Sequence, residues 1–408
     1  MKNAKHIAYF LELFPRLSET FILREIQGLK ARGFEVSIFS LINHNEKISQ
    51  TEALELSKNA FYLPDPFPIV RTLGLTFRFF IFRPLRVIAV FLMLVRTLRF
   101  IRGVGAMLQA FYFANIINNM SIEHIHAHWA TRPSTLALIA SELLQIPFTA
   151  TYHAVDIFVR PEMLPIKLKK ALRTFTCSHY NLQYLCNHVT LPYSRNIVVI
   201  PNIIDLESFT PPEKSKSHLS KVLTVCRLVE KKGIEYLIGA LAQLRDKGQY
   251  FKLAIAGDGP LREELEARVR DLKLENHVEF MGAIKFEEVL TLYMRSDIFV
   301  LPCVIAENGD REGMPTSLIE AMAAALPVVS TSIIGIPELV DDGVNGILVP
   351  PGDSSAIAEA LTSLAADSVW AASLGSKARE TVAARFDNKL VLDLLVKYMF
   401  ESSEAQYE

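Results

Sequence analysis

Residues 221–257, KVLTVCRLVEKKGIEYLIGALAQLRDKGQYFKLAIAG, decide the fold class of this chain. The apolar runs Lys221–Leu228 and Tyr250–Gly257 predict two strands, and Ile234–Arg245 between them has the apolar spacing of a helix. Both strands are continuous apolar runs, which is typical of a parallel sheet covered on both faces. A strand, a helix and a second parallel strand form the repeating unit of an α/β sheet.

The alternation of predicted strands and helices continues on both sides of this stretch. Toward the C-terminus we expect helices at Leu261–Leu274, Phe286–Arg295 and Pro315–Ala325, and strands at His277–Met281, Asp297–Pro302, Pro327–Thr331 and Gly346–Val349. Toward the N-terminus we expect strands at His6–Glu12, Phe34–Leu41, Ile122–His126, Pro147–Tyr152, Phe175–Ser178 and Asn196–Pro201, and helices at Ser18–Arg32, Pro133–Gln145 and His179–His188. The chain therefore holds two runs of α/β units.

A polar, proline-containing stretch separates the two runs. Thr210–Ser220, TPPEKSKSHLS, has no periodicity and predicts a linker. We expect two Rossmann-like, doubly wound parallel-sheet domains at 1–209 and 221–385, with an interdomain cleft. A C-terminal helix at 386–408 is expected to pack back on the first domain. Ligands of such sheets bind at the carboxyl ends of the strands, which favours that cleft.

Composition agrees with two folded domains. The chain has 408 residues, of which half are apolar and 21% are charged, and this excludes a mostly disordered chain. Forty-three basic and 44 acidic residues exclude an overall charge suited to nucleic acid. The four cysteines form no Cys-x-x-Cys pattern, so we expect neither disulfides nor zinc, and a cytoplasmic location. The start predicts no signal peptide, and Val87–Val95, the longest apolar run, is too short to span a membrane.

One segment has an unusual charge pattern. Between Pro66 and Ile122 there is no Asp or Glu, while arginines alternate with phenylalanines and aliphatic residues. This pattern favours the headgroup boundary of an anionic membrane. The alternatives are core helices whose arginines pair with acids elsewhere, and single-stranded nucleic acid, which the high aliphatic content disfavours. The candidate membrane residues are Arg71, Arg78, Arg83, Arg86, Arg96, Arg99 and Arg102.

Two motifs of the second domain suit a phosphate ligand. In CRLVEKKG, Arg227 ends a predicted strand and Lys232 precedes a helix, so two cations and free backbone N–H groups are available to a diphosphate. In GDGPL, Gly257 and Gly259 let the backbone approach a ligand, although a tight turn explains them equally. Arg262 stands where the dinucleotide fingerprint needs a third glycine, so a Rossmann dehydrogenase is not supported.

Two further motifs offer carboxylates and a histidine. In EGMPTSLIE, Pro315 is expected to begin a helix, which places Glu312 in the preceding loop and Glu320 on the second turn. These carboxylates could accept hydrogen bonds from sugar hydroxyls, or form only a surface pair. In TYHAVDIF, His153 and Asp156 follow a predicted strand. His153 could bind a substrate hydroxyl or a phosphate, act as an acid–base group, or have only a structural role in the loop. His124, His126 and His128 alternate along one strand, but a metal site there is disfavoured.

Taken together, CRLVEKKG, GDGPL, EGMPTSLIEAMA and GVNGILVPPGD resemble glycosyltransferase family 4, whose members are retaining enzymes of the GT-B fold. FPRLSETFILREI, HIHAHWATRPS, TYHAVDIF and CVIAENGDREGMP resemble the colanic-acid and amylovoran type of exopolysaccharide glycosyltransferases. The chain departs from many members at Leu17–Thr20, where they carry a Gly-Gly turn.

The resemblance implies roles for named residues. Arg227 and Lys232 would hold the diphosphate of a UDP- or GDP-linked sugar, Glu320 the ribose, and Glu312 the sugar. His153 would contact the sugar or the diphosphate near the acceptor. The expected catalytic residues are His153, Glu312, Arg227 and Lys232. The other implied donor-binding residues are Gly257, Gly259, Met281, Gly313, Met314 and Pro315, and the acceptor-side residues are Ser18, Glu19, Thr20, His128 and Asp156. No metal or cofactor is implied, because fixed cations and a helix N-terminus stabilise the leaving diphosphate.

These features favour transfer of a sugar to a lipid-linked oligosaccharide, with a polyprenyl diphosphate carrier, at the inner face of the cytoplasmic membrane. A GT-B-like nucleotide-sugar 2-epimerase is one alternative, but it leaves the arginine-rich segment without a purpose. A non-catalytic membrane-bound adaptor is another, and the presence of Arg227, Lys232, Glu312 and Glu320 argues against it.

Overall fold

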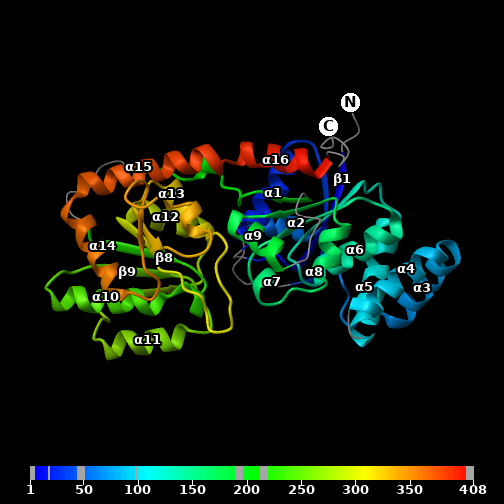
Figure 1. Ribbon diagram of the computed structural model, residues 1–408, viewed down its shortest axis with the longest axis horizontal. Coiled ribbons are helices and arrows are strands. Elements are labelled where there is room, and N and C mark those ends of the chain that lie inside the picture. The colour runs from blue at the N-terminus through cyan, green and yellow to red at the C-terminus, as the bar shows by residue number, and fades with distance from the viewer. Residues whose placement is uncertain are drawn as a thin grey trace. The chain divides into compact units, whose positions relative to one another are not determined.

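The computed structural model describes residues 5–16, 19–43, 51–97, 100–188, 196–211 and 219–400. The chain forms two compact units (Figure 1). The first comprises the chain up to Cys177, Asn181–Ile200 and the residues from Leu392 onward, and the second comprises Ser178–Tyr180 and Pro201–Val391. The domain boundaries expected at 209 and 386 stay predictions. Most of the expected linker, residues 212–218, lies outside the described residues.

The first unit is built on a seven-stranded parallel sheet with the strand order β3-β2-β1-β4-β5-β6-β7. The order runs outward in both directions from β1 and β4, which confirms the predicted doubly wound class. The two-residue edge strand β3 is too short to leave an apolar run that could be predicted. The strands are β1 His6–Phe14, β2 Glu35–Asn43, β3 Phe61–Tyr62, β4 His124–His128, β5 Phe148–Tyr152, β6 Arg173–Thr176 and β7 Ile197–Val199.

Helix α1, Thr20–Ala31, follows the first strand and buries Ile22, Ile26 and Leu29, the predicted face. It begins two residues later than predicted, with Glu19 at the N-cap position and no side-chain cap. Ser18, the expected cap, lies outside the described residues. The other helices of this sheet are α2 Thr51–Ser57, α6 Arg132–Leu144, α7 Val155–Phe158, α8 Leu164–Lys170 and α9 His179–His188, and α2, α7 and α8 are too short to be predicted.

Three helices form the arginine-rich segment: α3 Ile69–Phe82, α4 Pro84–Thr97 and α5 Phe100–Ile117. In Figure 1, α5 and α6 lie between the sheet and the α3–α4 pair. Phe79, Val90 and Leu94 bury one face of this pair in the core, while its other face is exposed. In the described part of the chain, no helix combines the length and apolar character needed to cross a membrane.

The second unit has a six-stranded parallel sheet with the order β10-β9-β8-β11-β12-β13. Figure 1 shows α10 and α11 on one face of this sheet and α12 and α13 on the other. The strands are β8 Lys221–Val225, β9 Lys252–Ala256, β10 Val278–Gly282, β11 Ile298–Leu301, β12 Val328–Thr331 and β13 Ile347–Val349. The helices are α10 Ile234–Asp246, α11 Arg262–Asp271, α12 Phe286–Arg295, α13 Thr316–Ala323, α14 Ser354–Ala366, α15 Ser368–Arg385 and α16 Asn388–Phe400, the last of which runs on into the first unit.

Candidate functional site

The second sheet reverses its strand order at β8, which has β9 on one side and β11 on the other. The segments that leave the carboxyl ends of these neighbouring strands therefore start at one edge of the sheet, which is where ligands of open α/β sheets bind. They carry CRLVEKKG after β8, GDGPL after β9 and the loop to Pro315 after β11. The topology thus gathers the predicted donor-binding motifs at a single edge.

Lys231, Lys232 and Glu312 form an ion cluster at this edge. The Lys232 ammonium contacts Glu312 Oε2, and Lys231 Nζ lies 3.4 Å from Glu312 Oε1 and 3.2 Å from Asp310 Oδ1. The three side chains of Lys231, Lys232 and Glu312 are only 12–14% exposed. The backbone N–H of Val304 donates to the Lys231 carbonyl at 2.9 Å, which ties the loop after β11 to the turn after β8. Sequence reasoning paired Glu312 with the sugar and grouped Asp310 with it only as part of a polar cluster, and it did not single out Lys231.

The cluster holds both kinds of charge in their ionised forms. Burial by itself would raise the pKa of Glu312, but the ammonium groups of Lys232 and Lys231 lower it to about 2. Burial likewise opposes the charge on Lys232, yet Glu312 raises the pKa of that ammonium above its ordinary value. A nearly buried patch with two fixed cations and the carboxylates of Glu312 and Asp310 can therefore offer charge-assisted hydrogen bonds to an anion and to a hydroxyl side by side.

The glycines of GDGPL have a structural explanation. A Cβ on Gly257 would lie 1.9 Å from the Cys226 carbonyl oxygen, and a Cβ on Gly259 would lie 2.4 Å from the Leu228 carbonyl oxygen. Gly257 also has a φ of +134°. These residues let the turn after β9 pack against the segment after β8, so they shape the edge rather than only making room for a ligand. Gly233 is equally constrained, because its Cβ would lie 2.0 Å from the Pro302 carbonyl oxygen.

Helix α13 begins at Thr316, with Pro315 at the N-cap position, so Pro315 precedes the first helical turn that it was expected to begin. The helix ends at Ala323, before the predicted Ala325. Asn202 Nδ2 donates to Thr316 Oγ1 at 3.2 Å at this helix start, a contact that no local pattern predicts. Glu320 is buried on α13 and accepts a hydrogen bond from the Tyr293 hydroxyl at 3.2 Å. Burial with a polar partner orients its carboxylate.

The remaining donor-side candidates are spread along the same edge. The Arg227 side chain is exposed, whereas Met314 is buried. Met281 lies next to Gly282, whose carbonyl accepts the Gly257 N–H at 2.8 Å, so the β9 and β10 ends meet there. Among the described residues, Lys232 contacts Glu312 directly, whereas no contact joins Arg227 to that pair.

The first unit brings four polar residues of separate elements together. Glu25 of α1 accepts a hydrogen bond from the Tyr9 hydroxyl at 2.7 Å, and the same oxygen lies 3.2 Å from His128 Nε2. His128 Nδ1 in turn lies 3.2 Å from His153 Nε2. His153 is 6% exposed and His128 is fully buried. The sequence singled out both histidines but not Glu25 or Tyr9, whose contacts form only in the folded sheet.

Asp156 shapes the loop that carries His153. Its carboxylate accepts the backbone N–H of Ala130 at 2.7 Å and that of His153 at 3.1 Å. Burial raises the pKa of Asp156, although these backbone donors oppose the rise. Asp156 is completely buried, so its contacts fix the backbone, and the expected direct role on the acceptor side stays untested.

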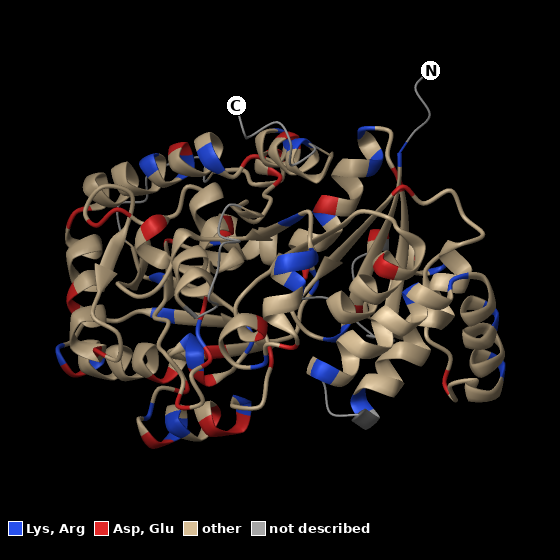
Figure 2. Cartoon of the chain, turned by 45° about the vertical axis from the view of Figure 1, so that its right-hand side comes forward, with Lys and Arg blue, Asp and Glu red and all other residues tan. Residues whose placement is uncertain are grey.

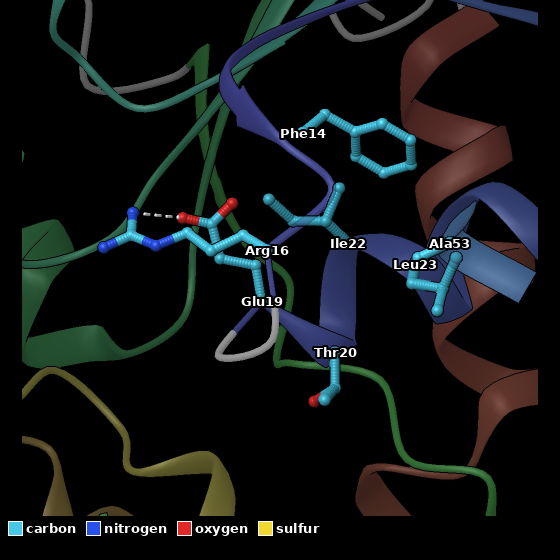
Figure 3. A pocket seen from close by; sticks show the side chains of 7 residues that line it. All are labelled: Phe14, Arg16, Glu19, Thr20, Ile22, Leu23 and Ala53. Carbon is cyan, nitrogen blue, oxygen red and sulfur yellow. Dashed lines mark hydrogen bonds and ion pairs between the residues drawn. The ribbon is translucent and has the colours of Figure 1, made fainter. Parts of the chain in front are cut away.

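Glu19 and Thr20 line a small pocket at the start of α1 (Figure 3). Arg16 Nη1 lies 2.8 Å from Glu19 Oε1, and Figure 3 shows this pair beside an apolar side formed by Phe14 and Ile22. Burial raises the pKa of Glu19 to about 7, and Arg16 opposes part of that rise. The full lining is Phe14, Arg16, Glu19, Thr20, Ile22, Leu23 and Ala53.

One set of potential metal ligands occurs among the described residues. Atoms of Glu25, His126 and His128 lie within 4.8 Å of one another. Each already has a protein partner: Tyr9 donates to Glu25, His153 contacts His128, and His126 has Thr149 at 2.8 Å and Thr151 at 3.2 Å. These contacts account for the set as a hydrogen-bond network. It also differs from the alternating histidines of the sequence, because His124 pairs with Thr149 instead.

Comparison with known proteins assigns both units to one class. Residues 18–208 match the family model described as Glycosyltransferase Family 4, and residues 220–367 match the model described as Glycosyl transferases group 1. The chain belongs to the glycosyltransferases. The predicted resemblance is therefore confirmed. The first match spans β2 to β7 of this glycosyltransferase, and the second match spans the whole second sheet.

Two curated glycosyltransferases are similar to part of this chain. The glycosyltransferase is 37% identical over 190 residues to the putative colanic acid biosynthesis glycosyltransferase WcaL of Escherichia coli, covering 46% of this chain and 47% of the relative. It is 37% identical over 179 residues to the amylovoran biosynthesis glycosyltransferase AmsK of Erwinia amylovora, covering 44% of each. The aligned part thus spans about half the length of these relatives.

Solved structures agree on the fold. HepE of Anabaena, crystallised with UDP and glucose, superposes with a TM-score of 0.71 at 18% identity, covering 96% of this chain and 98% of HepE. This likeness confirms the GT-B class, with two parallel-sheet α/β domains.

Proposed function

We propose that this glycosyltransferase is a retaining hexosyltransferase that acts on a nucleotide sugar and a lipid-linked oligosaccharide in the synthesis of an exopolysaccharide or another cell-surface polysaccharide. The observation that carries the proposal is the Lys231–Lys232–Glu312 cluster at the strand-order reversal of the second sheet. The activities named for WcaL and AmsK support the polysaccharide setting. The UDP and glucose bound by HepE support a nucleotide-sugar donor.

In the proposed mechanism, Lys231, Lys232 and Arg227 hold the donor diphosphate and stabilise its charge as it leaves. Glu312 accepts a hydrogen bond from a hydroxyl of the transferred sugar, and Glu320 accepts hydrogen bonds from the ribose hydroxyls. The bond between the sugar C1 and the diphosphate oxygen breaks while an acceptor hydroxyl oxygen attacks C1 from the same face. Because the attack comes from the face that the diphosphate leaves, the configuration at C1 is retained, and the proton of the acceptor hydroxyl goes to the leaving diphosphate oxygen. The charge that develops on the diphosphate meets cations that are already in place.

We propose that no divalent ion is needed, since the fixed ammonium groups and the start of α13 supply the positive field that a metal would supply. The test is release of nucleotide from UDP-, GDP-, ADP- and dTDP-sugars, with and without membrane lipid extract, in the presence of EDTA. Chelator-resistant release from one donor that depends on lipid extract is the expected result. Loss of all turnover in EDTA contradicts the metal-independent mechanism. Conversion of the donor sugar without any acceptor identifies an epimerase instead.

We also propose that the exposed face of α3 and α4 binds an anionic lipid surface, close to where a lipid-linked acceptor is carried. Twelve of the twenty exposed large apolar side chains among the described residues lie between Ile69 and Val95. Phe82 is 74% exposed and Leu85 is 80% exposed. In Figure 2 these helices carry basic but no acidic residues, which complements an anionic headgroup layer.

Not all of the predicted arginines are available for lipid. Arg71, Arg78, Arg96 and Arg102 are exposed, and Arg99 lies outside the described residues. Arg83 Nη1 donates to the Leu143 carbonyl at 2.6 Å, and Arg86 reaches the same oxygen at 3.4 Å, so both act at the C-terminal end of α6. These two arginines bond a backbone carbonyl rather than the acids that the alternative expected, so the proposed lipid contact does not include them.

The membrane proposal is tested by sedimentation with vesicles that contain phosphatidylglycerol. Combined Phe82→Ser and Leu85→Ser substitutions are expected to release the protein, because the inserted apolar area is lost. Val369→Ser, which removes an equally exposed side chain from α15, serves as the matched control. Unchanged sedimentation of the double variant contradicts the assignment of this face.

A further inference from the structure

His153 lies at the end of a chain of buried hydrogen bonds that starts on a different element. The chain runs from the Tyr9 hydroxyl to Glu25 Oε1, then to His128, and from His128 to His153. Its members come from β1, α1, β4 and the segment after β5, so only the folded first unit assembles it. All three links measure between 2.7 and 3.2 Å, within hydrogen-bond range.

The order of donors and acceptors along this chain follows from the Glu25 carboxylate. A carboxylate can only accept, so the Tyr9 hydroxyl and His128 Nε2 both donate to Glu25. A neutral imidazole with a proton on Nε2 accepts at Nδ1, so His153 Nε2 donates to His128 Nδ1. His153 is then protonated at Nε2, which leaves its Nδ1 as an acceptor. Among the described residues, no side chain or backbone group is bonded to that Nδ1.

The surroundings keep these groups neutral and the ring in place. Burial lowers the pKa of His153 well below its ordinary value, and His128 adds to this effect. Burial, together with Glu25, raises the pKa of Tyr9, so its hydroxyl keeps its proton. The rings of Trp129 and Phe21 lie 4.3 and 4.9 Å from the His153 ring, measured between centroids.

The backbone beside this ring is strained. Trp129 has a φ of +76°, a conformation that is rare for a bulky residue. Its N–H donates to the Thr151 carbonyl at 2.9 Å, which holds the residue in this conformation while its ring packs on His153. Strain that the surrounding structure maintains is concentrated at functional sites. The strain, the buried ring and its unpartnered Nδ1 point to a ligand group at this position.

We propose that Tyr9, Glu25 and His128 are positioning residues that fix His153 as the Nε2-protonated tautomer and present its Nδ1 lone pair to a sugar hydroxyl. That the ligand of His153 is a sugar rests on the proposed function. The tautomer of His153 is a property of the free protein and does not depend on the proposed function. His153 itself touches the substrate, whereas the other three act through it.

The direct test is nuclear magnetic resonance of the full-length chain with nitrogen-15 in its histidines. The His153 signals are identified by their loss in His153→Gln. The proposal expects a protonated Nε2 and an unprotonated Nδ1 in the free wild-type protein. A proton on Nδ1 overturns it, and this measurement needs no further folded variant. A joint shift of the His126 and His128 signals on adding Zn²⁺, reversed by EDTA, also overturns it, because the cluster then binds metal.

Two substitutions separate the acceptor role of Glu25 from its bulk. Glu25→Met removes the acceptor and is expected to give a mixture of His153 tautomers. Glu25→Gln keeps an amide oxygen for both Tyr9 and His128, which bond the same carboxylate oxygen, and is expected to retain the wild-type tautomer. Glu123→Gln, an exposed position just before β4, is the matched control. An unchanged tautomer in Glu25→Met contradicts the proposal.

Activity gives an independent readout. In Glu25→Met, kcat is expected to fall about tenfold or more while the KM for the nucleotide sugar stays unchanged, and Glu25→Gln is expected to recover most of the loss. A parallel rise in donor KM would instead indicate a general structural defect and would contradict the positioning role. Absence of turnover with every donor in the wild-type protein would refute the proposed function, while the tautomer measurement would still decide this inference.

Discussion

Replacing Glu312 by Gln removes the carboxylate that Lys231 and Lys232 share. The pKa of this carboxyl group falls from 4.5 to about 2 in the folded protein. A shift of this size corresponds to about 3 kcal/mol of stability at neutral pH, and the side chain is only 14% exposed, so solvent screens it little. The variant also leaves the nearly buried Lys232 ammonium without the carboxylate that pairs with it, whereas Lys231 keeps Asp310.

The expected result is a lower melting temperature for the second unit, by roughly 6–12 °C at pH 7. Thermal unfolding followed by circular dichroism or calorimetry measures it. Glu279→Gln removes an exposed carboxylate of β10 and serves as the control, with a change near zero. A melting temperature of Glu312→Gln within a degree or two of the wild type would refute the ion-cluster reasoning.

The contribution of Glu312 to stability is expected to depend on pH. Because the folded pKa of Glu312 lies below its unfolded value, its contribution is present above about pH 4.5 and is lost as the pH falls toward 2. The difference between wild type and Glu312→Gln is therefore expected to shrink over that range. A difference that stays constant between pH 6 and pH 2 would assign the loss to packing rather than charge.

The same variant tests the proposed diphosphate site. Without Glu312, the Lys232 ammonium loses its carboxylate and Lys231 keeps only Asp310, so UDP or GDP is expected to raise the melting temperature more in the variant than in the wild type. Transfer of the sugar is expected to fall, because the carboxylate that holds its hydroxyl is gone. A smaller nucleotide-induced shift in the variant would contradict the placement of the diphosphate on these lysines.

Three further outcomes are expected. Lys232→Ala leaves Glu312 paired with the second lysine of the cluster, so the fold should persist while donor turnover falls about a hundredfold or more, which steady-state kinetics would measure. The stability of the wild type relative to Lys167→Met should rise between about pH 7 and 10.5, because burial lowers the folded pKa of Lys167 to about 7; a flat difference in chemical denaturation would contradict this. Gly259→Ala should lower the melting temperature, since its Cβ meets the Leu228 backbone at 2.4 Å, and an unchanged value would show that the turn adapts.

Local sequence patterns were sufficient to predict the helices and strands of the second unit. Its predicted helices and strands correspond to the observed elements, because apolar runs and glycine turns mark each of them along the chain. The elements of the first unit were harder to predict. Helices α2, α7 and α8 have only four to seven residues, so they are too short to show a helical pattern of apolar residues. The arginine-rich segment mixed two roles that composition cannot separate: Arg83 binds a helix end, whereas Arg78 is exposed.

The sequence by itself determined the fold class, the division into two domains and the motifs that carry Lys232, Glu312 and His153, because these depend on residues near one another in the chain. Only the tertiary structure decided their partners. Lys231 meets Glu312 across 81 positions, and Glu25 meets His128 across 103. The physical reason is that a parallel sheet brings strand ends together through long crossovers, so charges and hydrogen bonds between them leave no local pattern.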